Sequence, residues 1–287
     1  MLRLGLDVGG SATRWVLMRR AEVAARGETE GFSGHLFDST MIARVEALLQ
    51  ALARDLAGHG RIAAVAAGVT GTAEGAETAH RLATLLAAAF DAPLARVRVV
   101  GDMVVAHRAA FPPGQGILLY AGTGSVAAHV DAAGQLHTAG GRGSILDDGG
   151  SAHWLAVRAL RRVLRQEDAA PGSGWATPLG QSLAAAIGGV EWDRVRAAIY
   201  GRDRGAVAAL ARYIVDADDL FDAAAAELIR LVHALRQRIG CEPVVASGRA
   251  LALSPRLVAG LVLDGQPVPV VSIDSGMAAA LLAGELP

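Results

Sequence analysis

Residues 2–13 read LRLGLDVGGSAT, an apolar run that ends in a carboxylate and two glycines. This pattern predicts a buried strand at Leu2–Val8, followed by a tight turn. Glycines without Cβ let backbone N–H groups approach phosphate oxygens, and Ser11 and Thr13 add hydroxyl donors. The carboxylate of Asp7 suits Mg²⁺, which prefers hard oxygen ligands. A β-hairpin with a Gly-Gly turn explains the glycines equally well.

The rest of the first half alternates strands and helices. Residues 38–57 carry Ile, Val and Leu at helical spacing, whereas the neighbouring apolar runs are short and rich in Val and Ala. A chain of 287 residues, at roughly 100–200 per domain, indicates two compact lobes. We expect strands at 2–8, 14–18, 22–25, 61–69 and 97–100, and helices at 38–57 and 74–90.

A second lobe follows the Pro-Pro-Gly break at residues 112–114, because three short strands succeed one another again. Helical patterns then dominate residues 151–238, and the acidic residues within 216–222 have the placement of a helix N-terminus. We assign the lobes to residues 1–105 and 106–274. The expected strands of this half are 116–121, 126–130, 135–138, 243–246 and 268–273, and a final helix covers 275–283.

Composition excludes several classes of function. The chain contains no lysine, so it has neither a Gly-Lys-Ser/Thr phosphate loop nor a Schiff-base lysine. A formal net charge of −1 gives no basic surface for nucleic acid or anionic membrane, which favours small-molecule partners. No apolar run reaches the roughly 18 residues of a spanning helix. The single cysteine, Cys241, is expected to be a packed thiol, and we expect a cytoplasmic protein.

Two further segments carry chemistry. Residues 121–125 read AGTGS between two strand patterns, which is a second glycine turn of a size that holds phosphate. A hairpin turn is an equally good explanation. Asp102 ends a strand and has the position of a helix cap. A hydroxyl that attacks a phosphoryl group also needs a carboxylate to orient it and accept its proton, and Asp102 fits that role.

Taken in order, these segments resemble the sugar-kinase, actin and heat-shock ATPase superfamily, in which two related lobes close on ATP. More narrowly, nearly the whole chain resembles the N-acetylglucosamine kinase branch of the BadF/BadG/BcrA/BcrD ATPase family. The resemblance implies a two-lobed α/β, actin-like ATPase fold with duplicated ribonuclease H-like domains and an inter-domain cleft. It also implies that a terminal helix within 275–287 packs back on the first lobe, and it is compatible with a homodimer.

The resemblance assigns roles to individual residues. It makes ATP and Mg²⁺ the cofactors, Asp7 the metal ligand and Asp102 the general base. Contacts to ATP fall on Gly9, Gly10, Ser11, Thr13, Gly122, Thr123, Gly124, Ser247 and Gly248. Contacts to the sugar fall on His35, Thr70, Asp102, Thr123, Gly141 and Asp148.

The presumed substrate segment departs from the family pattern. The family reads approximately Gly-Gly-Trp-Gly and then Gly-Asp-Glu-Gly-Ser, whereas this chain has GGRG at 140–143 and DDGGS at 147–151. Arg142 thus replaces an aromatic residue, and Gly149 replaces a glutamate. The family's Asn-His pair near the acyl group appears here as Gly-His at 34–35, in a chain without asparagine. Arg142 either lies on the surface or meets a carboxylate, as on a muramic-type sugar.

The function implied is transfer of the γ-phosphoryl group of ATP to an amino sugar, either N-acetylglucosamine or glucosamine. Two alternatives stay open: a catalytically silent sugar-binding relative, and a kinase of different specificity, for example for N-acetylmuramate. An activator ATPase of an acyl-CoA dehydratase requires cysteines for an iron–sulfur cluster, and one cysteine argues against it. A sugar-responsive repressor would carry a DNA-binding helical domain before the first glycine turn.

Overall fold

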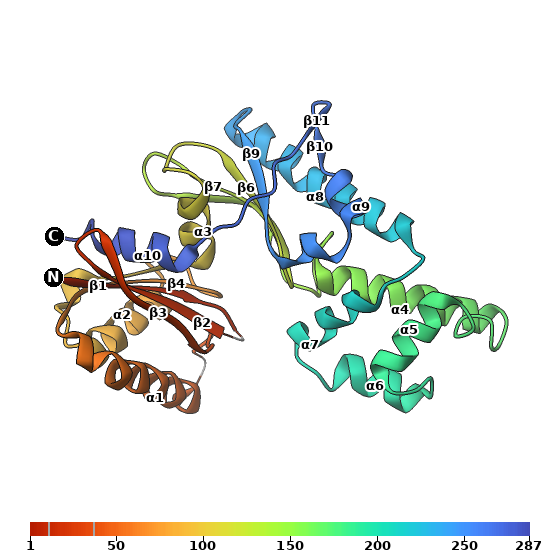
Figure 1. Ribbon diagram of the computed structural model, residues 1–287, viewed down its shortest axis with the longest axis horizontal. Coiled ribbons are helices and arrows are strands. Elements are labelled where there is room, and N and C mark those ends of the chain that lie inside the picture. The colour runs from red at the N-terminus through yellow and green to blue at the C-terminus, as the bar shows by residue number, and fades with distance from the viewer. Residues whose placement is uncertain (11, 37) are drawn as a thin grey trace. The chain divides into compact units, whose positions relative to one another are not determined.

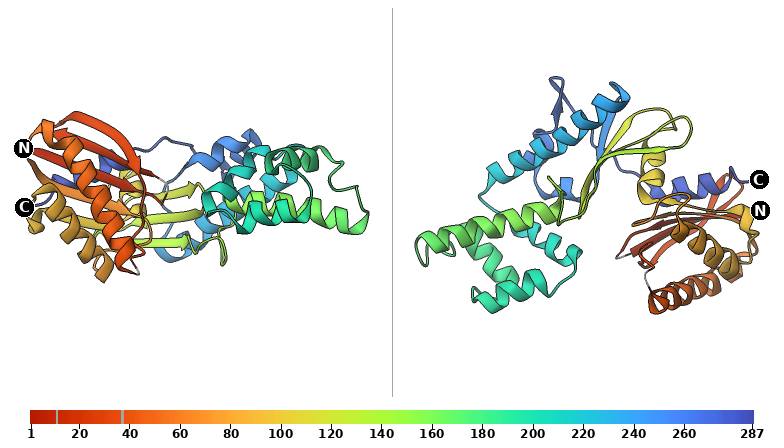
Figure 2. Two further views of the ribbon diagram at one scale, coloured as in Figure 1. Left: turned by 90° about the horizontal axis from the view of Figure 1, so that it is seen from below. Right: turned by 180° about the vertical axis from the view of Figure 1, so that it is seen from behind.

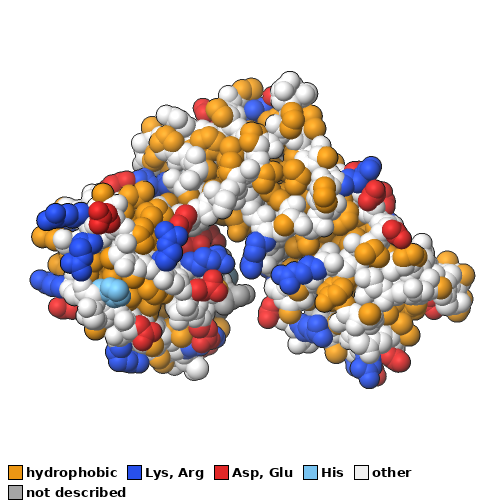
Figure 3. Space-filling model, in the orientation of Figure 1, with side chains coloured by type: hydrophobic (Ala, Val, Ile, Leu, Met, Phe, Trp, Pro, Cys, Tyr) orange, Lys and Arg blue, Asp and Glu red, His pale blue; other side chains and the backbone are white. Residues whose placement is uncertain are grey.

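The computed structural model describes residues 1–10, 12–36 and 38–287, which leaves residues 11 and 37 outside the description. Among the described residues, no helix is both long enough and apolar enough to cross a membrane. On the face shown in Figure 3, arginine and acidic side chains are interspersed. Charge of one sign is therefore not gathered into an extended patch on that face.

The chain forms two compact units (Figure 1). The first comprises Met1–Pro113 together with the C-terminal segment Ile273–Pro287. The second comprises Gly114–Ser272. Each unit has its own sheet and its own hydrophobic core.

A mixed five-stranded sheet forms the centre of the first unit. Its strands are β1 (Leu2–Val8), β2 (Ala12–Arg19), β3 (Glu22–Glu30), β4 (Ile62–Val69) and β5 (Val97–Gly101). Their order in the sheet is β3-β2-β1-β4-β5. Strands joined by a turn are antiparallel, and β1, β4 and β5, whose connections contain helices, are parallel.

Helices cover both faces of this sheet (Figures 1 and 2). They are α1 (Ser39–Leu56), α2 (Glu77–Phe90), α3 (Asp102–Ala110) and α10 (Ser275–Ala283), with 3₁₀ turns η1 (Ala57–His59) and η2 (Leu94–Arg96). α1 and α2 lie on one face, whereas α3 and α10 lie on the other. Asp38 starts α1, because its carboxylate accepts the N–H of Met41 at 2.9 Å.

Successive side chains of β1 point to opposite faces of the sheet. Leu2, Leu4, Leu6 and Val8 are buried in one core with leucines of α1 and α2. The intervening positions point the other way, toward α10. A Cβ on Gly5 would lie 2.1 Å from the backbone nitrogen of Ala280, so only glycine lets this helix approach.

The expected boundary at residues 105/106 falls inside α3. This helix packs against α10, β4 and β5, and the first compact unit therefore continues to Pro113. The C-terminal helix α10 packs against β1, β2 and β4 of the same unit. Two distant segments of the chain thus complete one core.

The second unit carries a four-stranded sheet with the order β8-β7-β6-β9. These strands are β6 (Ile117–Ala121), β7 (Ser125–Val130), β8 (Leu136–Gly140) and β9 (Val244–Ser247), and a separate ribbon contains β10 (Val262–Leu263) and β11 (Gln266–Pro267). Its helices are α4 (Ala152–Ala169), α5 (Pro178–Ile187), α6 (Trp192–Tyr200), α7 (Arg204–Ala209), α8 (Asp218–Ile239) and α9 (Pro255–Ala259), with 3₁₀ segments η3 (Leu210–Tyr213) and η4 (Arg249–Leu253).

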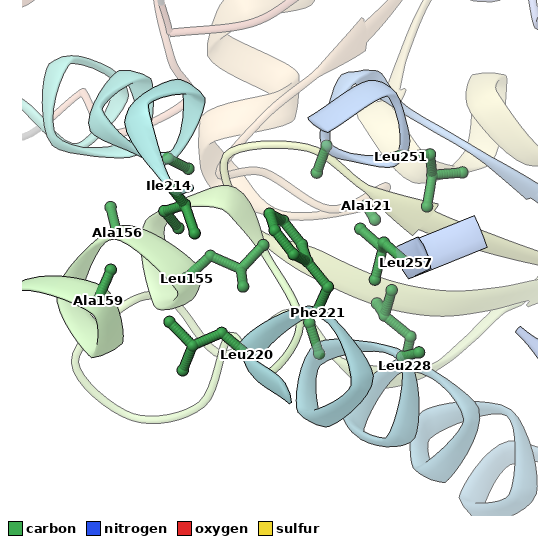
Figure 4. Close-up of a cluster of buried hydrophobic side chains, with 14 of the residues drawn as sticks. Ala121, Leu155, Ala156, Ala159, Ile214, Leu220, Phe221, Leu228, Leu251 and Leu257 are labelled. Carbon is green, nitrogen blue, oxygen red and sulfur yellow. The ribbon is translucent and has the colours of Figure 1, made fainter. Parts of the chain in front are cut away.

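The core of the second unit lies between its sheet and the long helices. Figure 4 shows Phe221 of α8 among aliphatic side chains such as Leu155 of α4 and Leu257 of α9. Leu155 and Leu257 are fully buried, as is Ala121 at the end of β6. Since Ala121 begins the second glycine turn, the core holds the base of that turn in place.

Two sequence expectations are wrong. Residues 268–273 do not form a strand but an isolated bridge between Val270 and Ala246. Pro269 supplies no N–H within this segment, so a continuous ladder cannot form. Cys241 is exposed, in the connection between α8 and β9, and is not a packed thiol.

The close approach at Gly5 gives a prediction about stability. Gly5→Ala should lower the free energy of unfolding by about 1–3 kcal/mol, because the added methyl group collides with the backbone of α10. Urea unfolding followed by circular dichroism measures the change. Gly58→Ala is the control, because a Cβ there meets no atom within 4 Å, and it should be nearly neutral. Equal stability of Gly5→Ala and the parent would show that α10 does not pack on β1 this closely.

Candidate functional site

The expected catalytic side chains of the first unit lie at one edge of its sheet. In the parallel register, Val69 of β4 lies between Val8 of β1 and Gly101 of β5. Asp7 and Asp102 therefore lie at the carboxyl ends of two parallel strands, β1 and β5, that are separated only by β4. In open α/β sheets this is the edge at which ligands bind.

Asp7 is a partly buried carboxylate in an acidic environment. Its Oδ2 lies 3.7 Å from Nη1 of Arg14, the residue opposite it on β2. Burial raises the pKa of Asp7, Arg14 opposes this shift, and the neighbouring carboxylates of Asp102 and Asp274 add to it. Together these effects bring the pKa of Asp7 to about 6. A cation beside Asp7 would favour its ionised form.

Asp102 is the first residue of α3, and Gly101 is the N-cap. Its Oδ1 accepts the N–H of Met103 at 2.8 Å, so the carboxylate lies at the positive end of the helix dipole. The side chain is part-buried. An acid held in one orientation at a sheet edge is suited to orient a hydroxyl group and to accept its proton.

Besides Asp102, the other two sugar-contact residues expected in the first unit are brought to the same edge. The N–H of Thr70 donates to the carbonyl of Val8 at 3.0 Å, and the carbonyl of Thr70 accepts the N–H of Gly34 at 2.8 Å. The ring of His35 lies over Gly71, where a Cβ would be 2.8 Å from Nε2. Thr70 and His35 are therefore neighbours, beside the end of β1.

The first glycine turn is partly described. The N–H of Gly9 donates to the carbonyl of Ala12 at 2.9 Å, which closes the hairpin. Gly10 is exposed, and a Cβ there would meet no atom within 4 Å. Thr13 is buried, and its Oγ1 has no hydrogen-bond partner among the described residues. Ser11, the other expected hydroxyl donor, lies outside the described residues.

The second glycine turn is held by the N-terminus of α4. The N–H of Ala152 donates to the carbonyl of Gly122 at 3.0 Å, and the N–H of His153 donates to that of Thr123 at 3.3 Å. Inside the turn, the N–H of Gly122 donates to the carbonyl of Gly124 at 2.8 Å. In the described part of the chain, the N–H groups of Thr123 and Gly124 find no protein acceptor. They are the donors that a phosphate would use.

The glycine-rich substrate segment packs directly under this turn. Asp148 is only 5% exposed, and a Cβ on Gly124 would lie 3.0 Å from its Oδ2. The backbone N–H groups of Ser125 and Gly143 partly offset the rise in the pKa of the Asp148 carboxyl that burial causes. The hydroxyl of Ser125 donates to the carbonyl of Gly149 at 2.7 Å. The turn and the substrate segment are therefore one structural element.

Electrostatics single out the carboxylate of Asp148. Burial raises its pKa, and the nearby guanidinium of Arg204 partly offsets the effect. Nη1 of Arg204 lies 3.8 Å from Oδ2 of Asp148. Oδ2 is buried and has no hydrogen-bond partner among the described residues. A buried oxygen of this kind is suited to accept a hydrogen bond from a ligand hydroxyl.

The other expected contacts of the second unit adjoin the same turn. The N–H of Gly141 donates to the carbonyl of Ser125 at 2.8 Å, and its φ of +68° favours glycine. Ser247 ends β9, which pairs with β6. A Cβ on Gly248 would lie 2.2 Å from the carbonyl oxygen of Ala121. This glycine is therefore required where the two backbones meet.

Sequence analysis missed three charged residues near these groups. Arg204 lies beside Asp148. Asp274 is the N-cap of α10, and its charge raises the pKa of Asp7. Oε2 of Glu227 lies 2.9 Å from the position of a Cβ on Gly149, so α8 fills the space of the missing side chain. Only Asp274 left a local signal, because an acid before an apolar helix is a typical cap.

The acidic edge of the first unit fits a partly hydrated cation. Among the described residues, no group of three or more His, Cys, Asp or Glu side chains is arranged to hold a metal ion. Mg²⁺ commonly keeps several waters and binds one or two carboxylates together with substrate phosphates. A single carboxylate with raised pKa, as at Asp7, agrees with that mode of binding.

Solved structures share this fold over nearly their whole length. A proposed N-acetylglucosamine kinase of Chromobacterium violaceum is 22% identical, with 98% of each chain covered and a TM-score of 0.74. A protein of the same description from Porphyromonas gingivalis is 20% identical, with 98% of each chain covered and a TM-score of 0.76. A Streptomyces griseus ROK family glucokinase, solved with glucose and AMPPNP, is 15% identical, covers 100% and 99%, and has a TM-score of 0.51.

These likenesses confirm the expected actin-like ATPase fold. The chain belongs to the BadF/BadG/BcrA/BcrD ATPase family, whose model matches residues 4–259. The family expected from the glycine turns and the two strand-end acids is thereby confirmed. Comparison with curated proteins finds no match.

The raised pKa of Asp7 predicts a pH-dependent effect on stability. Between pH 3.8 and about 6 the folded state holds a proton that the unfolded state releases, so stability falls as pH rises through this window. Asp7→Asn removes this penalty and should stabilise the protein at pH 7.5 by on the order of 2–3 kcal/mol.

The gap between Asp7→Asn and the parent should close as pH falls toward 4, as measured by thermal unfolding at several pH values. Asp55→Asn, at an exposed position of α1, is the matched control and should track the parent throughout. A gap that does not change with pH would contradict the assigned environment of Asp7.

Proposed function

We propose that this protein is an ATP- and Mg²⁺-dependent kinase that phosphorylates an amino sugar, N-acetylglucosamine or glucosamine. The observation that carries the proposal is the position of Asp102, at the end of β5, within electrostatic reach of Asp7 at the end of β1. One acid is suited to the acceptor hydroxyl and the other to a phosphate-bound cation. Membership of an ATPase family supports the use of ATP.

The glycine turns are proposed to bind phosphate. Gly9, Gly10 and Thr13 belong to the first unit, and Thr123 and Gly124, with their N–H groups unpaired in the described chain, belong to the second. Backbone N–H donors are fixed before the substrate arrives, so they stabilise charge on the transferred group without reorganising. Ser247 and Gly248 are assigned to the adenosine end. Mg²⁺, held through Asp7, supplies neutralisation of the phosphate charge.

Asp102 is proposed to be the general base. It accepts the proton of the sugar hydroxyl while that oxygen bonds to the γ-phosphorus and the bond to the ADP oxygen breaks. The backbone N–H of Met103 donates a hydrogen bond to this carboxylate and keeps it in one orientation. Thr70 and His35 lie at the same edge of the first unit and are assigned to the sugar. In the second unit, Gly141, Asp148 and Thr123 are assigned to it.

Asp102→Asn tests the role of the base. The variant should lower kcat for sugar-dependent ADP formation about 10²- to 10⁴-fold, because the amide keeps the shape of the side chain but cannot accept the proton. KM for ATP should change little. Coupled measurement of ADP release with N-acetylglucosamine gives both parameters.

The control for Asp102→Asn is Asp55→Asn, an exposed acid on α1 that should leave kcat unchanged. Parental kcat in Asp102→Asn would remove Asp102 from this role. If the parent forms ADP at the same rate with and without glucosamine, N-acetylglucosamine, N-acetylmuramate and glucose, the kinase proposal itself fails. Sugar binding without ADP formation would identify the silent relative instead.

A further inference from the structure

Arg204 is a cation at the substrate segment that sequence analysis did not identify. It is the first residue of α7, and its side chain is half exposed. Its Nη1 lies 3.8 Å from Oδ2 of Asp148 and 3.9 Å from the position of a Cβ on Gly143. It also lowers the pKa of His153, at the start of α4, after the larger effect of burial. Arg204 thus acts on several parts of the segment.

The pair formed by Arg204 and Asp148 is open. A separation of 3.8 Å is too long for a hydrogen bond, and Oδ2 of Asp148 has no such partner in the described chain. The guanidinium of Arg204 likewise makes no hydrogen bond to a described residue. A buried acceptor and the donors of a half-exposed guanidinium therefore lie next to each other, and both are available to a ligand.

Two other arginines of the same unit that lie beside carboxylates donate hydrogen bonds to them. Arg256 donates to both oxygens of Asp222, at 2.8 and 2.7 Å. Arg230 donates to Glu227 at 2.8 Å and also reaches Asp147. Arg204 makes no such hydrogen bond, although Asp148 is more deeply buried than Asp222 and Glu227. Its donors are left for a group that is not part of the chain.

We propose that Arg204 binds a carboxylate carried by the acceptor sugar, so that among amino sugars the enzyme prefers one with an acidic substituent to its neutral counterpart. This inference rests on the kinase function proposed above. A planar guanidinium matches a carboxylate in a two-point contact, whereas Asp148 repels anions and accepts from a neutral hydroxyl. On one ligand, Arg204 would bind the carboxylate group and Asp148 would accept a hydrogen bond from a hydroxyl group. Arg142, exposed on the same segment, is the competing candidate.

The test compares a neutral and an acidic sugar in the same enzyme. N-acetylglucosamine and N-acetylmuramate are suitable probes, because the second adds a carboxylate to the first. The parent should have the higher kcat/KM for the acidic sugar. Arg204→Gln should lower kcat/KM for that sugar about 10- to 100-fold, the value of one charge-assisted pair, and change the neutral sugar less than about threefold. Arg204→Lys should restore part of the preference.

Matched variants separate the alternatives. Arg202→Gln, an exposed arginine two residues away, should not alter the preference, and neither should Arg142→Gln. Equal losses for both sugars in Arg204→Gln would overturn the proposal and indicate that Arg204 contacts the transferred phosphate. Loss of preference in Arg142→Gln alone would assign the carboxylate to Arg142.

Direct binding keeps this test independent of catalysis. If the parent releases no ADP with either sugar, the kinase function fails, and calorimetric titration with the two sugars still examines Arg204. Tighter binding of the acidic sugar that disappears in Arg204→Gln supports the inference. Equal affinity for the two sugars, or no binding of either, contradicts it. Circular dichroism of each variant verifies that the fold is retained.

Discussion

Crowding of carboxylates around Asp7 is the constraint on which the proposed chemistry depends. Strand β1 places this acid at the sheet edge, and α3 and α10 bring Asp102 and Asp274 near enough to raise its pKa. The guanidinium of Arg14 does not cancel the rise in the pKa of Asp7 that burial and the carboxylates of Asp102 and Asp274 cause. Such an arrangement lowers the stability of the fold unless a bound cation reduces the repulsion between the carboxylates. For this reason we propose that this edge of the sheet binds a cation that accompanies phosphate.

The two units contribute different kinds of chemistry. The first supplies strand-end carboxylates on a sheet closed by a helix from the C-terminal segment. The second supplies a glycine turn whose carbonyl groups accept hydrogen bonds from the N-terminus of α4. The N–H groups of Thr123 and Gly124 in this turn have no acceptor in the described chain. Asp148 packs under that turn, so in the proposed function it would connect phosphate binding to substrate recognition. A ligand at this segment would therefore also affect the shape of the turn.

Local pattern was sufficient for most of the fold. The run at Leu2–Val8 predicted β1, and the helical spacing at 38–57 predicted α1, because each element buries one face with a clear period. The strand expected at 268–273 does not form. The apolar composition of this segment favoured a strand, but a proline within it interrupts the ladder of hydrogen bonds. Strand-end acids were identifiable from sequence. Arg204 and Glu227 were not, because they reach the substrate segment from α7 and α8 through tertiary packing alone.

The most direct measurement is the melting temperature of the parent protein with ATP in the presence and in the absence of Mg²⁺. If a cation relieves the acidic edge while phosphates occupy the glycine turns, Mg²⁺ and ATP together should stabilise the fold well beyond the sum of their separate effects. Equal stabilisation by ATP in EDTA, or none in either condition, would contradict the account of Asp7 and its neighbours.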